Sequence, residues 1–261
     1  VTYELTKNSA EVNNLHSGPD YYRDRIWDAE VEETALGTTI TFGLHSPDGD
    51  QGYPGNADIT VSYTLTPDNC LKLDYHMVSD ADTIANFTNH VYFNLGGYKS
   101  GSALDQKVWI DADYFTATDA NSIPTGELVA VKGTPMDFTE MKPIGRDIQE
   151  DYQALKYGNG YDHNWALNHP AGELSLSAKA EDEKTGRTME VYTDLPGVQF
   201  YTANSLKTER GKNHAVYTPR CGYCFETQYF PDAINKPEFA SPVIKAGEEY
   251  KTTTIYKFGV K

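Results

Sequence analysis

Positive charge, cysteine and long apolar runs are all scarce in this sequence. Its 261 residues hold 22 lysines and arginines against 38 aspartates and glutamates, which gives a net charge of −16. A surface this acidic repels phosphate backbones and anionic lipid, so nucleic-acid and membrane partners are disfavoured. A small neutral or cationic molecule remains open as a ligand. No apolar run approaches the roughly 18 residues of a membrane-spanning helix.

The three cysteines, at positions 70, 221 and 224, are too few for a disulfide scaffold. Their odd number indicates a reducing compartment, and we expect a cytoplasmic protein. Cys221 and Cys224 form a lone CxxC without a second pair or histidines at finger spacing, which argues against zinc. Residues 225–230 read as a strand, whereas a redox CxxC would start a helix, so we expect two buried or half-buried thiols with neither role. Serine-nucleophile, P-loop and HExxH motifs are absent too.

Alternation of apolar and polar residues dominates the chain. It covers 59–65 and 71–77, with the turn residues Thr66-Pro-Asp-Asn69 between them, and it covers 174–180 and 189–193. Each pair predicts an antiparallel hairpin. We expect further strands at 1–6, 38–44, 83–93, 107–110, 164–167, 198–202, 224–229 and 252–258, and a short helix near 144–157. These elements predict one all-β domain over residues 1–261, a sandwich or barrel, with long loops at 46–56 and 125–146.

Four polar clusters are unusual for plain β architecture: residues 14–19, 86–95, 160–165 and 224–235. Each places histidine, aspartate or glutamate beside amides and aromatic rings. Carboxylates and amides bind hydroxyl groups through directed hydrogen bonds, and aromatic faces pack on the apolar faces of a sugar ring. The mixture therefore favours a polyhydroxylated ligand.

The residues alone leave other interpretations open. Any single histidine fits a surface or core position. Glu226 fits a solvated strand face, or a covered strand end where a buried carboxylate must be paired or functional. Asp162 and His163 fit a turn before the strand expected at 164–167. Composition does not choose between these interpretations.

Seven stretches, in order along the chain, together resemble the aldose 1-epimerase (galactose mutarotase) family. They are Leu15-His-Ser-Gly-Pro19, Trp27-Asp-Ala29, Ser46-Pro-Asp-Gly-Asp-Gln-Gly-Tyr-Pro-Gly55, Asn89-His-Val-Tyr-Phe-Asn-Leu95, Gly160-Tyr-Asp-His-Asn164, Pro196-Gly-Val-Gln-Phe-Tyr-Thr-Ala-Asn204 and Phe225-Glu-Thr-Gln-Tyr-Phe-Pro-Asp-Ala-Ile-Asn235. The resemblance implies a large antiparallel β-sandwich, the galactose mutarotase-like super-sandwich. It also implies a monosaccharide substrate, with no metal and no cofactor.

Mutarotation interconverts the α and β anomers of a free sugar through the open-chain aldehyde. It needs a base for the C1 hydroxyl and an acid for the ring oxygen, and glutamate and histidine suit these tasks near neutral pH. By resemblance, Glu226 is the base and His90 is the acid. His16 and Asp162 match positions that bind sugar hydroxyls, and Trp165 and Tyr92 are expected to line the pocket.

Two alternatives are kept beside a galactose or glucose epimerase. A hexose-6-phosphate epimerase would need a basic cluster for the phosphate, and the basic residues here are scattered. A non-catalytic sugar-binding or regulatory module would be expected to lose Glu226 or His90, and both are present. Family members also carry a further N-terminal segment with an arginine that reaches the sugar. Nothing here matches that segment, and we expect the sequence to lack it, which bears on activity more than on fold.

Overall fold

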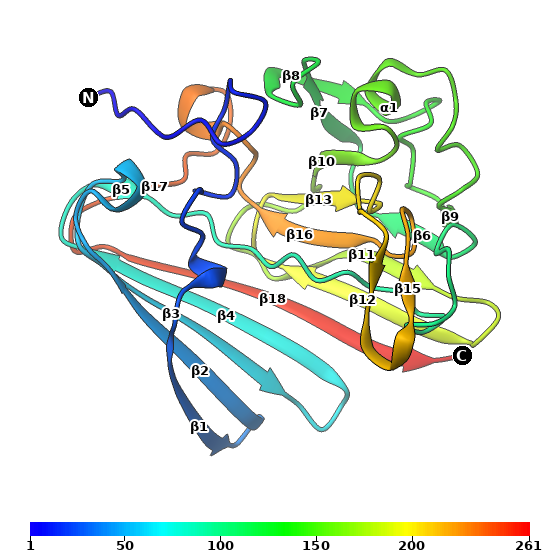
Figure 1. Cartoon of the computed structure of the whole chain (residues 1–261), viewed down its shortest axis with the longest axis horizontal. Coiled ribbons are helices and arrows are strands. Elements are labelled where there is room, and N and C mark those ends of the chain that lie inside the picture. The colour runs from blue at the N-terminus through cyan, green and yellow to red at the C-terminus, as the bar shows by residue number, and fades with distance from the viewer. The chain divides into compact units, whose positions relative to one another are not determined.

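The computed structural model describes residues 1–261, and nearly all of its regular structure is antiparallel β-sheet (Figure 1). The chain packs as two compact units. The first comprises Val1–Phe87 and Ser241–Thr253, and the second comprises Thr88–Ala240 and Thr254–Lys261. The all-β prediction is confirmed, whereas the prediction of a single domain over 1–261 stays a prediction. None of the helices has the length and apolar character that crossing a membrane requires.

The first unit is built on antiparallel strands in the order β1-β2-β3-β4-β18, of which β18 contributes its residues before 254. The strands are β1 (Asp28–Thr34), β2 (Gly37–Ser46), β3 (Ala57–Leu65), β4 (Cys70–Ser79) and β18 (Glu249–Val260), with a small pair of β5 (Thr83–Ile84) and β17 (Val243–Ile244) and the short 3₁₀ segments η1 (Tyr22–Asp24) and η2 (Asp50–Gly52). The first predicted hairpin is confirmed, because β3 pairs with β4 up to Leu65 and Leu71.

The second unit contains two sheets. One has the order β16-β13-β10-β7-β8, and the other joins the later residues of β18 to β12-β11-β6-β9. Its elements are β6 (Lys107–Ile110), β7 (Tyr114–Thr118), β8 (Pro124–Ala130), β9 (Lys142–Pro143), α1 (Gln153–Gly158), β10 (Asp162–Ala166), β11 (Ser175–Glu181), β12 (Arg187–Thr193), β13 (Gly197–Tyr201), β14 (Glu209–Arg210), η3 (Lys212–His214), β15 (Val216–Tyr217), β16 (Cys224–Gln228) and η4 (Ala233–Asn235). The second predicted hairpin is confirmed by the β11–β12 pairing.

The two sheets of the second unit meet face to face, as in a sandwich. Alternate residues of the five-stranded sheet turn towards the other sheet and bring Trp165, Phe200 and Phe225 into a core where each is at most 1% exposed. The Tyr256 hydroxyl of β18 donates to the Phe225 carbonyl at 2.8 Å, which ties one sheet to the other. An aromatic core of this size leaves the opposite face of the five-stranded sheet to carry polar groups.

Three expected elements are wrong, wholly or in part. Residues 1–6 form no strand and are mostly exposed, so their alternation has no sheet to bury against. Of the strand expected at 83–93, only Thr83 and Ile84 form a strand, and Phe93 forms an isolated bridge. Between them, Asn89 bonds the Tyr256 hydroxyl with its side chain. The loop expected at 125–146 contains most of β8 and all of β9, while α1 falls near the end of the predicted helical stretch.

Candidate active site

One face of three neighbouring strands carries the polar side chains that the sequence singles out. Strands β10, β13 and β16 lie side by side (Figure 1), and their registers place Asp162 opposite Tyr201, Tyr201 opposite Cys224, and Gln199 opposite Glu226. Directly paired residues of adjacent strands point to the same side of the sheet. These five side chains therefore share the face that looks away from the aromatic core.

His90 reaches this face from an irregular segment. Phe93 and Tyr223 exchange two backbone hydrogen bonds, of 2.8 and 3.0 Å, which fasten that segment to the residue just before β16. The His90 ring then lies with Nε2 at 3.5 Å from Glu226 Oε1 and Nδ1 at 3.2 Å from Cys224 Sγ. The structure thus brings together the two residues predicted to act as acid and base.

Two tyrosine rings lie beside the imidazole of His90. The centroid of the Tyr92 ring lies 5.0 Å from that of the His90 ring. The centroid of the Tyr201 ring lies 5.8 Å from that of the His90 ring, in an edge-to-face arrangement. The His90 side chain keeps 34% of its surface exposed. Tyr92 is therefore placed beside His90, and its role in lining a sugar pocket stays a prediction.

The Glu226 carboxyl is buried, with 6% of the residue exposed. Burial, together with the negative charge of Asp162, raises the pKa of Glu226 from its ordinary value of 4.5 to about 8. The covered strand end, rather than the solvated face, is the correct interpretation of this residue. A carboxyl group whose pKa is raised towards neutral pH is suited to exchange a proton with a substrate.

A chain of side-chain amides holds the Asp162 carboxyl. Gln199 Nε2 donates to Asp162 Oδ1 at 2.8 Å, and Gln228 Nε2 donates to Asn164 Oδ1 at 3.1 Å and to Gln199 Oε1 at 3.3 Å. Burial raises the pKa of Asp162 to about 6, which the hydrogen bond from Gln199 partly offsets. Asp162 lies in β10, so the turn interpretation of this residue is wrong.

Of the other residues expected at the site, one stays a prediction and one is placed elsewhere. His16 lies in the first unit, on an exposed turn with a φ of 54°, so its sugar-binding role stays a prediction. Trp165 does not line the polar face, because it is 0% exposed and its Nε1 donates to the Met136 carbonyl inside the core. His163 also turns into the core, where burial lowers its pKa to about 4 and keeps it neutral.

Gln199, Tyr201 and Cys224 are functional candidates that sequence reasoning did not single out. The alternating sequence pattern already places Gln199 with Tyr201, and Cys224 with Glu226, on one face of their strands, because residues two apart in one strand share a face. The sequence pattern does not show which strands are neighbours in the sheet. The pairing of Gln199 with Glu226 depends on β13 lying next to β16.

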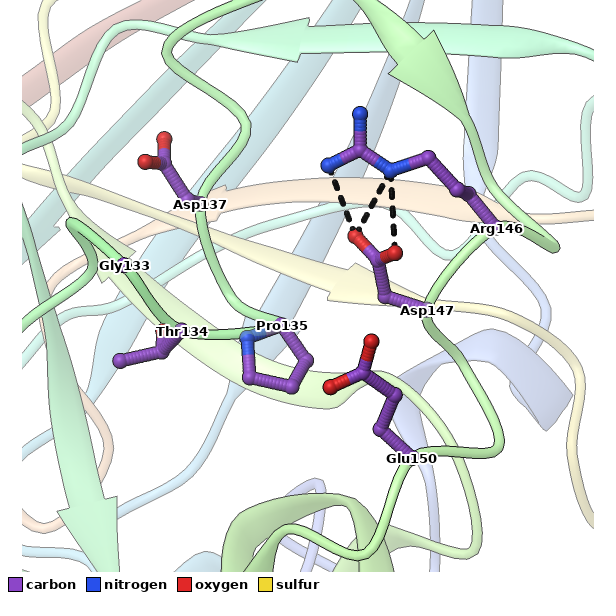
Figure 2. A pocket seen from close by; sticks show the side chains of 7 residues that line it. All are labelled: Gly133, Thr134, Pro135, Asp137, Arg146, Asp147 and Glu150. Atoms are coloured by element: carbon purple, nitrogen blue, oxygen red, sulfur yellow. Dashed lines mark hydrogen bonds and ion pairs between the residues drawn. The ribbon is translucent and has the colours of Figure 1, made fainter.

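A hollow of about 290 Å³ in the same unit shares no residue with this cluster. Figure 2 shows its lining, in which Arg146 points at Asp147 with Nη2 at 2.9 Å from Oδ2. The same carboxylate accepts at 2.7 Å from the buried Lys142, and both interactions keep the pKa of Asp147 below its ordinary value. The charges of Arg146, Lys142 and Asp147 therefore satisfy one another.

The model of the aldose 1-epimerase family matches residues 1–257. The chain belongs to this family. It is 40% identical over 259 residues to the galactose mutarotase of Homo sapiens, which covers 99% of this chain and 72% of that protein. It is 35% identical over 252 residues to the aldose 1-epimerase of Escherichia coli (strain K12), which covers 96% of this chain and 71% of that protein.

Solved structures of the aldose 1-epimerase family agree on the fold. The galactose 1-epimerase from Lactobacillus acidophilus NCFM superposes with a TM-score of 0.85 and 28% identity, covering 99% of this chain and 73% of that one. The aldose epimerase homologue from C. elegans superposes with a TM-score of 0.86 over 99% of this chain and 75% of that one, at 24% identity. The predicted family, its mutarotase-like β-sandwich and an isomerase-class enzyme are thus confirmed.

Proposed function

We propose that the chain interconverts the α and β anomers of a free hexose, galactose or glucose, with Glu226 and His90 as the catalytic pair. The single observation that carries the residue assignment is the 3.5 Å approach of His90 Nε2 to the buried Glu226 Oε1 on the polar face of β16. Membership of the aldose 1-epimerase family supports the reaction class.

The reaction moves two protons and breaks one bond. Glu226, as the carboxylate, takes the proton of the C1 hydroxyl as His90, as the imidazolium, gives its Nε2 proton to the ring oxygen, and the bond between C1 and the ring oxygen breaks. The aldehyde turns about the C1–C2 bond and the ring closes on its other face. Closure returns both protons, with protonated Glu226 now acting as the acid and His90 as the base.

Binding groups flank the pair. Asp162, held by Gln199 at 2.8 Å, is proposed to accept hydrogen bonds from sugar hydroxyls, and His16 is proposed to do so by family resemblance. The rings of Tyr92 and Tyr201 lie 6.2 Å apart beside His90, and they offer apolar faces to a sugar ring. The expectations of no metal, no cofactor and a cytoplasmic location remain proposals.

Neither alternative, a hexose-6-phosphate epimerase or a non-catalytic sugar-binding module, is supported by the residues of this face. The face of β10, β13 and β16 carries Asp162, Gln199, Tyr201, Cys224 and Glu226, with no lysine or arginine among them to bind a sugar phosphate. A non-catalytic module has no need to keep a buried carboxyl within 3.5 Å of an imidazole, because that arrangement costs stability.

Polarimetry on freshly dissolved α-D-galactose and α-D-glucose tests the proposal. The chain is expected to speed relaxation to the anomeric equilibrium at low buffer concentration, and galactose 6-phosphate serves as the comparison sugar. Relaxation at the buffer rate for both free sugars would overturn the proposed function.

The pH dependence has a defined direction. Glu226 must be ionised in the free enzyme to act as base, and its pKa is raised to about 8. The ionisation of Glu226 is therefore expected to raise kcat/KM on the acid side of the profile, and the loss of the proton from His90 is expected to lower it on the alkaline side, after subtraction of the hydroxide-catalysed rate. A profile that is flat from about pH 6 to about pH 9 would contradict the assigned role.

A further inference from the structure

A row of side-chain amides runs along the polar face of the five-stranded sheet and ends at the Asp162 carboxyl. Gln228 on β16 is the centre of this row, because its Nε2 donates to Gln199 Oε1 at 3.3 Å and to Asn164 Oδ1 at 3.1 Å. Gln199 Nε2 in turn donates to Asp162 Oδ1 at 2.8 Å. A primary amide nitrogen carries two hydrogens, so these two bonds use the full donor capacity of Gln228 Nε2.

A glycine in the middle strand gives Gln228 the room to reach Asn164. Gln228 pairs with Gly197 on β13, so the two residues share the polar face. A Cβ atom at position 197 would lie 2.5 Å from Asn164 Oδ1 and 2.8 Å from the nearest ring atom of Phe230. Because glycine has no side chain, Gln228 on β16 contacts Asn164 on β10 across the strand that separates them.

The carboxylate at the end of the row fixes the direction of its hydrogen bonds. Burial raises the pKa of Asp162 to about 6, so the group is ionised at neutral pH and only accepts hydrogen bonds. Gln199 must therefore present its nitrogen to Asp162, and its oxygen then faces the nitrogen of Gln228. This direction leaves Asn164 Nδ2 buried without a hydrogen-bond partner, which costs stability. Reversing the Asn164 amide would set its NH₂ group against the NH₂ group of Gln228.

We propose that Gln228 is a positioning residue for sugar binding, which fixes the Gln199 amide so that its NH₂ group holds the Asp162 carboxylate in place for the substrate. The inference rests on the proposed function, in which Asp162 accepts hydrogen bonds from sugar hydroxyls. Without Gln228, the Gln199 amide is free to turn its oxygen towards Asp162, where two acceptors repel each other. Gln228 thus acts on the substrate through Gln199 and Asp162, and its loss weakens binding more than proton transfer.

A double-mutant cycle separates this role from a purely structural one. Gln228→Met keeps the length of the side chain and removes its donors, and it is expected to raise KM for α-D-galactose about fivefold with kcat within about twofold of wild type. Gln199→Met is expected to raise KM at least as much. Because Gln228 acts through Gln199, the double variant is expected to match Gln199→Met alone. Gln153→Met, at the exposed start of α1, is the matched control.

A second measurement needs neither a variant nor enzyme activity. NMR measures how fast the side-chain NH₂ hydrogens of each glutamine exchange with water, and each NH₂ signal is assigned through bonds from its own backbone. Both hydrogens on Gln228 Nε2 are expected to exchange more slowly than those of the exposed Gln153, because both are held in hydrogen bonds.

Three results would overturn the inference: KM effects that multiply in the double variant, a wild-type KM in folded Gln228→Met, or Gln228 hydrogens that exchange as fast as those of Gln153. Near-ultraviolet circular dichroism shows whether each variant keeps its aromatic core, and the exchange rates of the wild type decide the matter if Gln228→Met does not fold. Failure of the proposed function would appear differently, as a wild-type chain that leaves mutarotation at the buffer rate while its Gln228 hydrogens stay protected.

Discussion

Glu226→Gln is expected to lower kcat for the mutarotation of α-D-galactose by about 10² to 10⁴-fold. The amide fills the same space beside His90 but cannot take the proton of the C1 hydroxyl. Initial rates by polarimetry at about pH 8 measure the loss. Full activity in this variant would remove Glu226 from the base role.

The same substitution is expected to leave the fold intact and to change how stability depends on pH. Because the folded pKa of Glu226 is raised from 4.5 to about 8, its contribution to stability is complete below about pH 4.5 and is lost as pH rises through about 8. The wild type should lose up to about 1.4 kcal/mol of unfolding free energy per pH unit over that window relative to Glu226→Gln. Urea unfolding at two pH values measures the difference.

Glu127→Gln is the matched control for both readouts. Glu127 lies exposed on β8 in the same unit, and it takes no part in the polar face of β10, β13 and β16. It is expected to keep wild-type kcat and the wild-type pH dependence of stability. If Glu226→Gln showed the same pH dependence of stability as this control, the burial of an ionisable carboxyl at position 226 would be contradicted.

His90→Asn is expected to lower kcat by about 10²-fold or more, because asparagine has no nitrogen that exchanges a proton at neutral pH. Its amide is close in size to part of the imidazole, so the rings of Tyr92 and Tyr201 should keep their positions. KM is therefore expected to change little. His214→Asn, in the exposed 3₁₀ segment η3, serves as the control. Unchanged kcat in His90→Asn would assign the acid to another group.

Local patterns predicted most strands, because alternation and turn residues are properties of neighbouring positions. The hairpin from β3 to β4 was readable in this way, as was β6 with its bounds of Lys107–Ile110. The strand expected at 83–93 was wrong for most of its length, because only Thr83 and Ile84 pair as a strand and only Phe93 makes a further bridge, to Tyr223. A pattern reports that a segment could pair, whereas the available partner is decided by distant parts of the chain.

The candidate site was predictable as residue types and not as geometry. The family resemblance named Glu226, His90 and Asp162, and the structure places all three in the second unit. Cys224 drew attention only as part of a CxxC. Its contact with His90 arises because the Phe93–Tyr223 bridge brings together residues more than a hundred positions apart. The pattern of neighbouring residues in the sequence does not reveal long-range pairing of this kind.

Strands β10, β13 and β16 also define which changes this protein tolerates. Positions 163, 165, 198, 200, 225 and 227 fill the core, while positions 162, 199, 201, 224 and 226 lie on the opposite, polar face. Directed evolution of sugar preference can therefore diversify Gln199 and Tyr201 while the core positions, Glu226 and Asp162 stay unchanged. A single-residue insertion at the start of β16 would turn Phe225 to the polar face and Glu226 into the aromatic core. We therefore expect the protein to tolerate substitutions at Gln199 and Tyr201 better than any change in the length of β16.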